Sequence, residues 1–191
     1  ILQAIRTRIS QDDIVTLIYT SGTTGDSKGV MLTNKNLIAN CIGSMNSIKV
    51  SETDSAMSYL PFCHSFERMV TLYVLFTIGT TTAIATSIDT LITEIAEIKP
   101  TFMTTVPKFL DTVKKKIFTA MSKEPLAKRK IFDWAVSIGT KYTKARFNNK
   151  SSLLIQPQYN IANKLVLSKL REKLGGNLRQ FISGGAALSA E

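Results

Sequence analysis

The sequence contains few of the residues that mark several specialised classes of protein. Two cysteines in 191 residues are too few for a disulfide framework, which favours a reducing compartment. Five prolines and ten glycines exclude collagen-like and low-complexity chains. No initiator methionine and no signal-peptide pattern is seen, and we interpret residues 1–191 as a piece of a longer protein. Hydrophobic residues make up 44% of the chain, enough for a core, so bulk disorder is excluded.

Charge is distributed unevenly along the chain. The formal net charge is +10, but residues 1–107 hold seven basic residues against nine acidic ones. Residues 108–179 hold seventeen basic residues against four acidic ones, a net charge of +13. Such a segment can face phosphates, an anionic membrane or nucleic acid, or it can be the solvated face of helices. Few aromatic residues lie among the basic ones and no nucleic-acid motif is recognised, so we predict no nucleic-acid partner.

Residues 69–88 carry no charge and are nominally long enough to span a bilayer. However, six threonines are scattered through them and Gly79 interrupts them. We therefore predict a buried helix over residues 69–78, a C-cap at Gly79 and a strand over residues 80–85. A ten-residue helix is only about 15 Å long, half of the hydrocarbon core, so we reject a transmembrane span.

Short apolar runs predict strands that alternate with helices, which indicates an α/β fold of layered sheets and helices. The predicted strands are residues 14–19 (buried), 30–32, 56–60, 101–106 and 178–183. Helices are predicted after the caps Thr33 and Asp89, and from Pro107 to about Ala120. The first is expected to bury Leu37, Ile38, Cys41, Ile42, Met45 and Ile48, and the second Leu91, Ile92, Ile95 and Ile98.

Two further helices are predicted within the basic segment. Apolar residues spaced three and four apart define one face of each, and Gly175-Gly176 ends the second helix. The first face comprises Ala127, Ile131, Trp134, Ile138 and Tyr142, and the second comprises Tyr159, Ala162, Val166, Leu170 and Leu174. Residues 147–158 are predicted to be a flexible loop between them.

The most informative stretch is residues 19–30, YTSGTTGDSKGV, which follows a predicted strand. Its glycines let backbone N–H groups approach a ligand, its hydroxyls add donors, and Lys28 adds a cation. This composition suits a polyphosphate, although a polar hairpin loop without a ligand would look similar. The spacing is not that of a Walker A loop, because Gly29 follows Lys28 and no helix pattern begins there.

This stretch resembles the YTSGTTGxPKG signature of the adenylate-forming superfamily, which includes acyl-CoA synthetases, luciferases and peptide-synthetase adenylation domains. Ser27 stands where the family usually has Pro, which loosens the loop backbone. Three more stretches follow in the family's order. Residues 60–68 resemble the LPxxHxxER segment of long-chain acyl-CoA synthetases. Residues 99–108 resemble the KPT…VPR segment of the same enzymes, with Lys108 in place of Arg. Residues 182–189 resemble the family's SGGAPLS segment.

The resemblance implies the N-terminal fold of this superfamily and its two-step chemistry. A carboxylate attacks the α-phosphate of ATP, giving an acyl-adenylate and pyrophosphate, and the thiol of CoA then displaces AMP. The resemblance also implies that residues 1–191 are part of an AMP-binding domain. Within that domain, residues 108–179 would be a basic helical insertion typical of the long-chain branch. Fatty acid, ATP and CoA are the implied substrates, with Mg²⁺ as cofactor. A cytoplasmic protein in peripheral contact with an anionic membrane is expected.

The resemblance also assigns site residues by position. The nucleotide phosphates would be held by Thr20, Ser21, Gly22, Thr23, Thr24, Gly25 and Lys28, with Thr24 nearest the metal. Gly184, Gly185 and Ala186 would form the adenine side. His64 and Phe62 would gate the acyl site, although a lone histidine is often structural. An acyl tunnel could be lined by Phe66, Met69 and Tyr73, although ordinary core packing would explain them equally well. We expect a structural ion pair between Glu67 and Arg68. We expect the two cysteines, Cys41 and Cys63, to be inert.

The family's YGxTE segment, ribose-binding Asp, hinge and C-terminal catalytic Lys do not occur within these residues. We therefore assign no catalytic residue and predict that this chain alone has no ligase activity. Two alternatives stay open: an adenylate-forming enzyme that activates aryl or amino acids, and a non-catalytic basic module that binds membranes.

Overall fold

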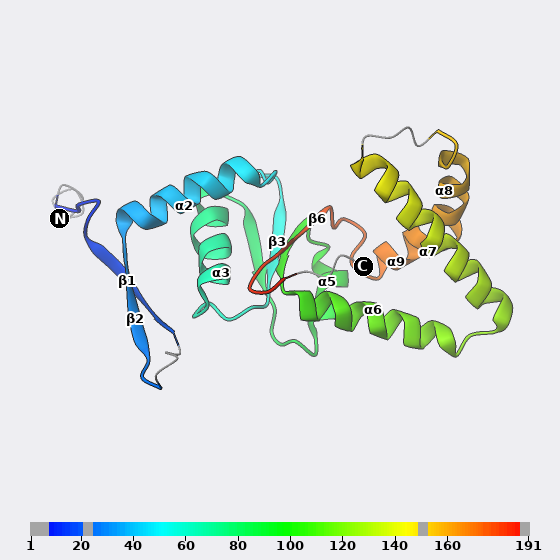
Figure 1. Cartoon of the computed structure of the whole chain (residues 1–191), viewed down its shortest axis with the longest axis horizontal. Coiled ribbons are helices and arrows are strands. Elements are labelled where there is room, and N and C mark those ends of the chain that lie inside the picture. The colour runs from blue at the N-terminus through cyan, green and yellow to red at the C-terminus, as the bar shows by residue number, and fades with distance from the viewer. Residues whose placement is uncertain (1–7, 21–24, 149–152, 188–191) are drawn as a thin grey trace. The chain divides into compact units, whose positions relative to one another are not determined.

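The computed structural model describes residues 8–20, 25–148 and 153–187, and Figure 1 shows its elements. The chain divides into two compact units, residues 1–85 and residues 86–191. Both contain helices and a pair of parallel strands, and the first also contains an antiparallel hairpin. The α/β class that the alternating pattern predicts is therefore confirmed.

The first unit begins with a hairpin of β1 (Ile14–Thr20) and β2 (Lys28–Thr33). The two strands are antiparallel, with Thr20 opposite Lys28 at the closed end. Both predicted strands are present, but the prediction that residues 14–19 are buried is wrong. Ile14, Leu17 and Tyr19 are exposed, because the described part of the hairpin is a two-stranded ribbon without further strands beside it.

Helix α2 (Asn34–Ser47) begins at the predicted cap, Thr33. The Thr33 hydroxyl accepts from the backbone N–H of Asn36, whose side chain in turn accepts from the backbone N–H of Thr33, forming a capping box. The buried face of helix α2 is narrower than predicted. Leu37 and Cys41 are half-buried, whereas the predicted inward residues Ile38, Ile42 and Met45 are exposed.

Strands β3 (Ser55–Ser58) and β4 (Thr81–Ile84) are parallel. They are joined by a helical crossover of α3 (Ser65–Glu67), η1 (Arg68–Leu75) and α4 (Phe76–Ile78). Gly79 ends the crossover with φ +84°, so the predicted helix and C-cap are confirmed. The π-helical turns of η1 were not predicted. No helix in the described part of the chain is long and apolar enough to cross a membrane.

The second unit contains α5 (Leu91–Ile98) and the parallel strands β5 (Phe102–Thr105) and β6 (Gln180–Ser183). Strand β5 is buried along its whole length, which fits its continuous apolar and threonine sequence. Leu91 and Ile95 of α5 are buried as predicted. The predicted cap is wrong: Thr90, not Asp89, occupies the N-cap position, and Ile98 is exposed at the helix end.

Between β5 and β6 the chain is helical. It forms α6 (Pro107–Ser122), α7 (Leu126–Phe147), α8 (Gln156–Ala162), η2 (Asn163–Leu167) and α9 (Ser168–Glu172), with α7 packed against α8 and η2 (Figure 1). Pro107 is the first residue of α6, as predicted. The predicted loop at 147–158 is shorter, because α7 continues to Phe147 and α8 begins at Gln156; residues 149–152 lie outside the described ranges.

The buried face of α7 differs from the predicted one in its first half. Phe132, Ala135 and Ile138 are buried, whereas the predicted residues Ala127, Ile131 and Trp134 are exposed. The ring of Phe132 packs edge-to-face on Phe118 of α6, with 5.3 Å between centroids. Contact with α6 therefore rotates the buried side of α7 away from the face that the sequence period favours.

The predicted inner face of the last helical segment is confirmed. Ala162 is buried against Ala135 and Ile138, with Tyr159 and Val166 packed beside it. The rings of Tyr159 and Tyr142 are stacked, with 3.9 Å between their centroids. Gly175 and Gly176 end the segment with φ +82° and +81°, as predicted.

Candidate functional site

The predicted phosphate loop connects the two strands of the β1–β2 hairpin. Thr20 and Lys28 form its last strand pair, and the Thr20 hydroxyl donates to the Lys28 carbonyl at 3.4 Å. Thr20, Gly25 and Lys28 are all exposed and accessible to a ligand. Ser21, Gly22, Thr23 and Thr24 lie outside the described residues.

Gly25 is the one described glycine of this loop in the left-handed region, with φ +95°. A Cβ added at this position would meet no other described atom within 4 Å. The conformation, and not crowding, therefore requires glycine here. A left-handed residue changes the direction of successive N–H groups, which is how a loop turns its backbone donors toward an anion.

His64 and Phe62 follow β3, on a turn at the carboxyl end of that parallel strand. His64 is exposed and is the N-cap residue of α3, although its side chain makes no capping hydrogen bond. The imidazole is therefore not engaged in capping the helix. Phe62 is half-buried, and Cys63 between them is exposed.

Arg68 holds this turn in place, while Glu67 accepts hydrogen bonds from side chains of β3 and η1. The Glu67 carboxylate is fully buried and accepts from the hydroxyls of Ser58, at 2.5 Å, and Thr71, at 2.6 Å. Arg68 donates from Nε to the Phe62 carbonyl at 3.0 Å and from Nη1 to the Thr16 hydroxyl at 2.7 Å. Arg68 thus connects the His64 turn to strand β1 of the hairpin, a link between two predicted site segments.

Cys41 of α2 differs from Cys63 in its surroundings. It is half-buried, and burial raises the pKa of its thiol. A raised thiol pKa lowers the fraction of reactive thiolate at neutral pH, which agrees with the expectation that Cys41 is inert.

The predicted adenine-side residues lie in the second unit, just after β6. Gly184 donates its N–H to the Thr105 carbonyl at 3.2 Å and so extends the β5–β6 pairing by one residue. Gly185 then turns the chain with φ +78°, and Ala186 is exposed. The segment therefore sits at the carboxyl edge of two parallel strands, where α/β proteins commonly bind ligands.

Ser183, the last residue of β6, is a candidate that the sequence analysis missed. Its hydroxyl oxygen is buried and has no hydrogen-bond partner among the described residues. Buried hydroxyls are rarely left unpaired, so this one indicates a partner that the described chain does not supply. In the sequence, Ser183 could have been noticed because it lies directly before Gly184-Gly185 and at the end of a predicted strand.

The described residues contain no group of three or more His, Cys, Asp or Glu side chains that could hold a metal ion. Thr24, the residue predicted nearest the metal, lies outside the described residues.

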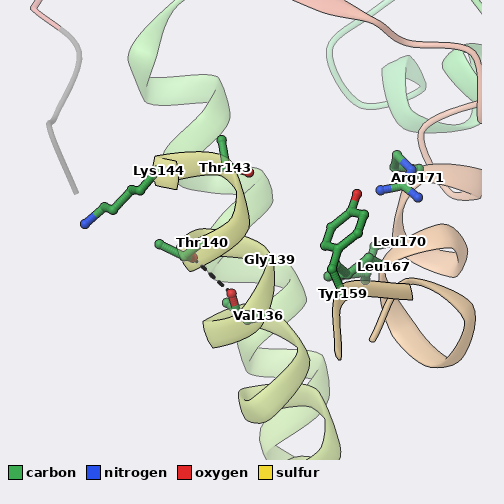
Figure 2. Close-up of a pocket in the computed structure, with 9 residues that line it drawn as sticks. All are labelled: Val136, Gly139, Thr140, Thr143, Lys144, Tyr159, Leu167, Leu170 and Arg171. Atoms are coloured by element: carbon green, nitrogen blue, oxygen red, sulfur yellow. Dashed lines mark hydrogen bonds between the residues drawn. The ribbon is translucent and has the colours of Figure 1, made fainter. Parts of the chain in front are cut away.

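A groove of about 540 Å³ runs between α7 and the segment from α8 to α9 (Figure 2). Its apolar lining includes Val136 and Leu167, and Lys144 and Arg171 are its cations. Figure 2 shows Lys144 pointing away from Tyr159 and Arg171, so the two cations do not converge on one point. The Thr140 hydroxyl is already used, donating to the Val136 carbonyl at 3.0 Å. We therefore do not assign the nucleotide site to this groove.

Comparison with known proteins agrees with the fold and with the sequence motifs. The chain matches the family described as AMP-binding enzyme over residues 3–191. It is 35% identical to fatty acyl-CoA synthetase B of Dictyostelium discoideum over 179 residues, which are 93% of this chain and 26% of that protein. It is 34% identical to long chain acyl-CoA synthetase 5 of Arabidopsis thaliana over 187 residues, 93% of this chain and 27% of that protein.

Among solved structures, the inhibitor-bound N-terminal domain of FACL13 from Mycobacterium tuberculosis shares the fold. It matches with a TM-score of 0.59 at 18% identity, over 96% of this chain and 33% of that chain. The fold of this N-terminal domain is thus confirmed, while the chain spans about a quarter to a third of the proteins that it matches.

Proposed function

The chain belongs to the AMP-binding enzyme family, and on that premise we propose that the protein activates long-chain fatty acids with ATP and transfers the acyl group to CoA. A carboxylate is a poor electrophile, because its negative charge repels an attacking thiol. Attack of the carboxylate on the α-phosphate of ATP gives an acyl-adenylate and releases pyrophosphate. Attack of the CoA thiol on that acyl carbon then releases AMP, with the thiol proton passing to solvent or to a base.

The observation that carries this proposal is the glycine and hydroxyl loop between Thr20 and Lys28, held at the end of a hairpin. Thr20, Gly25 and Lys28, together with residues 21–24 of the same loop, would hold the β- and γ-phosphates through N–H groups, hydroxyls and one ammonium. These donors neutralise the leaving pyrophosphate, which is the main electrostatic task in nucleotidyl transfer. Thr24 would be the loop residue nearest Mg²⁺, which, when bound, would add charge neutralisation at the phosphates.

The carboxyl edge of β5 and β6 would hold the nucleoside part. Gly184, Gly185 and Ala186 lack bulky side chains, so an adenine ring can lie close to the backbone. Ser183 offers a buried hydroxyl that has no partner among the described residues and that a nucleotide group could satisfy. His64 and Phe62 would stand at the acyl side, where an imidazole N–H can donate to the carboxylate that attacks.

The choice of a long-chain acid rests on the curated relatives and on the His64 segment. The relatives reported above are named fatty acyl-CoA and long chain acyl-CoA synthetases. Aryl or amino acids are the competing substrates within the same family. We further propose a cytoplasmic protein in peripheral contact with a membrane, because long-chain fatty acids partition into bilayers.

The test uses the protein encoded by the complete reading frame that contains this chain. ATP–pyrophosphate exchange is measured with palmitate, benzoate and a mixture of amino acids, and acyl-CoA is identified by mass spectrometry. We expect exchange and thioester formation with palmitate alone, and preference for an aryl or amino acid would overturn the assignment. The isolated 191-residue chain should show no exchange.

Two variants test the loop directly. Lys28→Ala and Thr23→Ala should each lower kcat/KM for ATP by about tenfold to a hundredfold, the loss expected for one charged or hydroxyl contact to a phosphate. Lys35→Ala is the matched control, because Lys35 is an exposed lysine of α2 outside the loop. Unchanged kinetics in both loop variants would refute the phosphate role.

A further inference from the structure

Arg68 donates three hydrogen bonds to two segments that are far apart in the sequence. Its backbone N–H donates to the His64 carbonyl at 3.1 Å, and its Nε donates to the Phe62 carbonyl at 3.0 Å. Its Nη1 donates to the Thr16 hydroxyl at 2.7 Å, across a separation of 52 residues. One residue therefore binds both residues of the predicted acyl gate and also the strand that leads into the predicted phosphate loop.

Thr16 lies on the inward side of the hairpin. Along β1, Thr16 and Ile18 are half-buried and the other residues of the strand are exposed. Because side chains alternate across a strand, Thr16, Ile18 and Thr20 share one face, and Thr20 forms the last strand pair before the loop. Four residues of strand span about 13 Å, so Arg68 holds the hairpin about 13 Å from the start of the phosphate loop.

The hairpin needs support from the rest of its unit, because a two-stranded ribbon is only marginally stable by itself. Among the described residues, the bond from Arg68 to Thr16 is the one hydrogen bond recorded between the strands β1 and β2 and the crossover from β3 to β4. Helix α2 contacts both β2 and η1, so it is a common neighbour of the hairpin and the crossover (Figure 1). Arg68 adds a directional bond to this packing and fixes the hairpin relative to the His64 turn.

An arginine suits this bridge better than a lysine would. The planar guanidinium holds its N–H groups at fixed angles, so Nε and Nη1 bind the Phe62 carbonyl and the Thr16 hydroxyl at the same time. A lysine ammonium on its flexible stem would not keep two such acceptors at a fixed separation. The preceding residue, Glu67, is buried and accepts from the Ser58 hydroxyl at the end of β3, so the helix start that carries Arg68 is itself held in place.

A fixed spacing between the two segments matters for the chemistry proposed above, and the present inference rests on that proposed function. In the first step a carboxylate oxygen attacks the α-phosphate in line with the departing pyrophosphate. The loop would hold the pyrophosphate and the His64 turn would hold the carboxylate, so the two reacting groups are bound by different segments. A misplacement of about 1 Å between reacting groups can cost about a hundredfold in rate. The second step is less demanding of the loop, because pyrophosphate has already left.

We propose that Arg68 is a positioning residue for the adenylation step, which sets the distance between the phosphate loop and the His64 turn through Thr16 and Phe62. Arg68 touches neither ATP nor the acid. Loss of the bridge leaves both binding segments intact but lets them shift relative to each other. Adenylate formation then slows, whereas the affinities for ATP and for the acid, and the rate of thioester formation, change little.

The test measures the two half-reactions separately in the protein from the complete reading frame. Adenylation is followed by ATP–pyrophosphate exchange with the acid that the parent protein activates, and thioester formation is started from purified acyl-adenylate and CoA. Thr16→Val removes the hydroxyl but keeps a residue that favours strands. We expect the kcat of adenylation to fall about tenfold or more, with both KM values within about threefold and thioester formation within about twofold of the parent. An unchanged adenylation rate, or equal losses in both half-reactions, would overturn the proposal.

Three further variants assign the effect to the bridge. Thr16→Ser keeps a hydroxyl and should retain adenylation within about threefold of the parent. Thr82→Val is the matched control and should stay within about twofold, because Thr82 is a half-buried threonine of β4 in the same unit that is not bonded to Arg68. Arg68→Lys should slow adenylation at least as much as Thr16→Val, and the double variant should lie within about twofold of Arg68→Lys alone. Losses that multiply in the double variant would show that the two residues act independently, and the proposal would be wrong.

Hydrogen–deuterium exchange tests the bridge without any substrate. The peptide of residues 14–20 should take up deuterium severalfold faster in Thr16→Val and in Arg68→Lys than in the parent, and at the parent rate in Thr82→Val. A variant that folds poorly would take up deuterium faster in every peptide; if Arg68→Lys does so, Thr16→Val decides alone. If the parent activates no acid, the proposed function fails while deuterium uptake still tests the bridge. Unchanged uptake in the hairpin would overturn the bridge even where ligase activity is found.

Discussion

Among the glycines that the described chain holds in the left-handed region, Gly25 and Gly175 differ in the space around them. Gly25, in the hairpin loop, has φ +95° and no other described atom within 4 Å of the place where a Cβ would stand. Gly175, at the exit from the last helices, has φ +82°, and a Cβ there would lie 2.6 Å from the Ile95 carbonyl oxygen and 2.9 Å from the Lys99 Cα. Gly175 is therefore required by the close packing of the fold, whereas the open space around Gly25 leaves room for a ligand.

Gly175→Ala should give the largest effect on stability. The added methyl meets backbone atoms that cannot rotate away, and alanine is strained at this φ, so we expect a loss of about 3 kcal/mol or more in the free energy of unfolding. Urea denaturation measures it. Gly176→Ala is the control, since its φ is +81° but a Cβ would meet no described atom within 4 Å, and it should lose only about 1 kcal/mol. Equal losses would mean that crowding does not distinguish the two positions.

Gly25→Ala should separate activity from stability. Strain at φ +95° costs about 1–2 kcal/mol, and an exposed loop relaxes part of it by changing its backbone. That change misdirects the N–H donors, so kcat/KM for ATP should fall about tenfold or more while the thermal midpoint moves little. Gly43→Ala, in the middle of α2, should instead stabilise the protein by about 0.5–1 kcal/mol without affecting ATP use. A Gly25→Ala variant with normal ATP kinetics would contradict a ligand role for the loop.

Ser183→Ala extends the same comparison to hydroxyl groups. Ser58 and Ser183 are the last residues of β3 and β6, but the Ser58 hydroxyl donates to Glu67 whereas that of Ser183 has no partner among the described residues. Removing the unpaired hydroxyl should stabilise the unliganded protein by about 1 kcal/mol and raise KM for ATP severalfold. Ser58→Ala should destabilise it by about 1–3 kcal/mol. If Ser183→Ala lost stability as well, the hydroxyl would have a structural partner.

Glu94→Gln should give the smallest effect, and one that depends on pH. A hydrogen bond from the Thr90 side chain, followed by one from the Thr86 backbone, lowers the pKa of the Glu94 carboxyl below its usual 4.5. A lowered pKa in the folded state means that the charged form adds stability above pH 4.5, and that this contribution is lost as the pH falls. The variant should therefore lose less stability than the parent between pH 7 and pH 3 in urea titrations. Parallel curves would show that the Glu94 contacts do not matter in solution.

Local signals in the sequence gave reliable predictions where one short segment decides the structure. The cap at Thr33, the helix start at Pro107 and the left-handed end at Gly79 all depend on residues close in sequence, and all three are confirmed. The two strands on either side of the glycine-rich stretch were predicted in the same way, from apolar runs, but their antiparallel pairing was not.

Predictions failed where a distant contact decides the structure. Periodicity placed Trp134 inside, but the packing of Phe132 on Phe118 buries Phe132 instead and leaves Trp134 exposed. Ile38 and Ile42 have the spacing of a buried face, yet nothing in the described chain covers them. Ser183 could not be identified from residue type alone, because serine is common at strand ends and its lack of a partner is visible only in three dimensions.

Cys63 is a suitable position for a fluorescent label beside His64. Its thiol is exposed next to His64, whereas Cys41, the other cysteine of this sequence, is half-buried with a raised pKa. Since maleimides react through the thiolate, a fluorophore added near neutral pH should attach to Cys63 before Cys41. A dye at that position would test the proposed acyl role of the His64 turn, because its emission should change when palmitate is added.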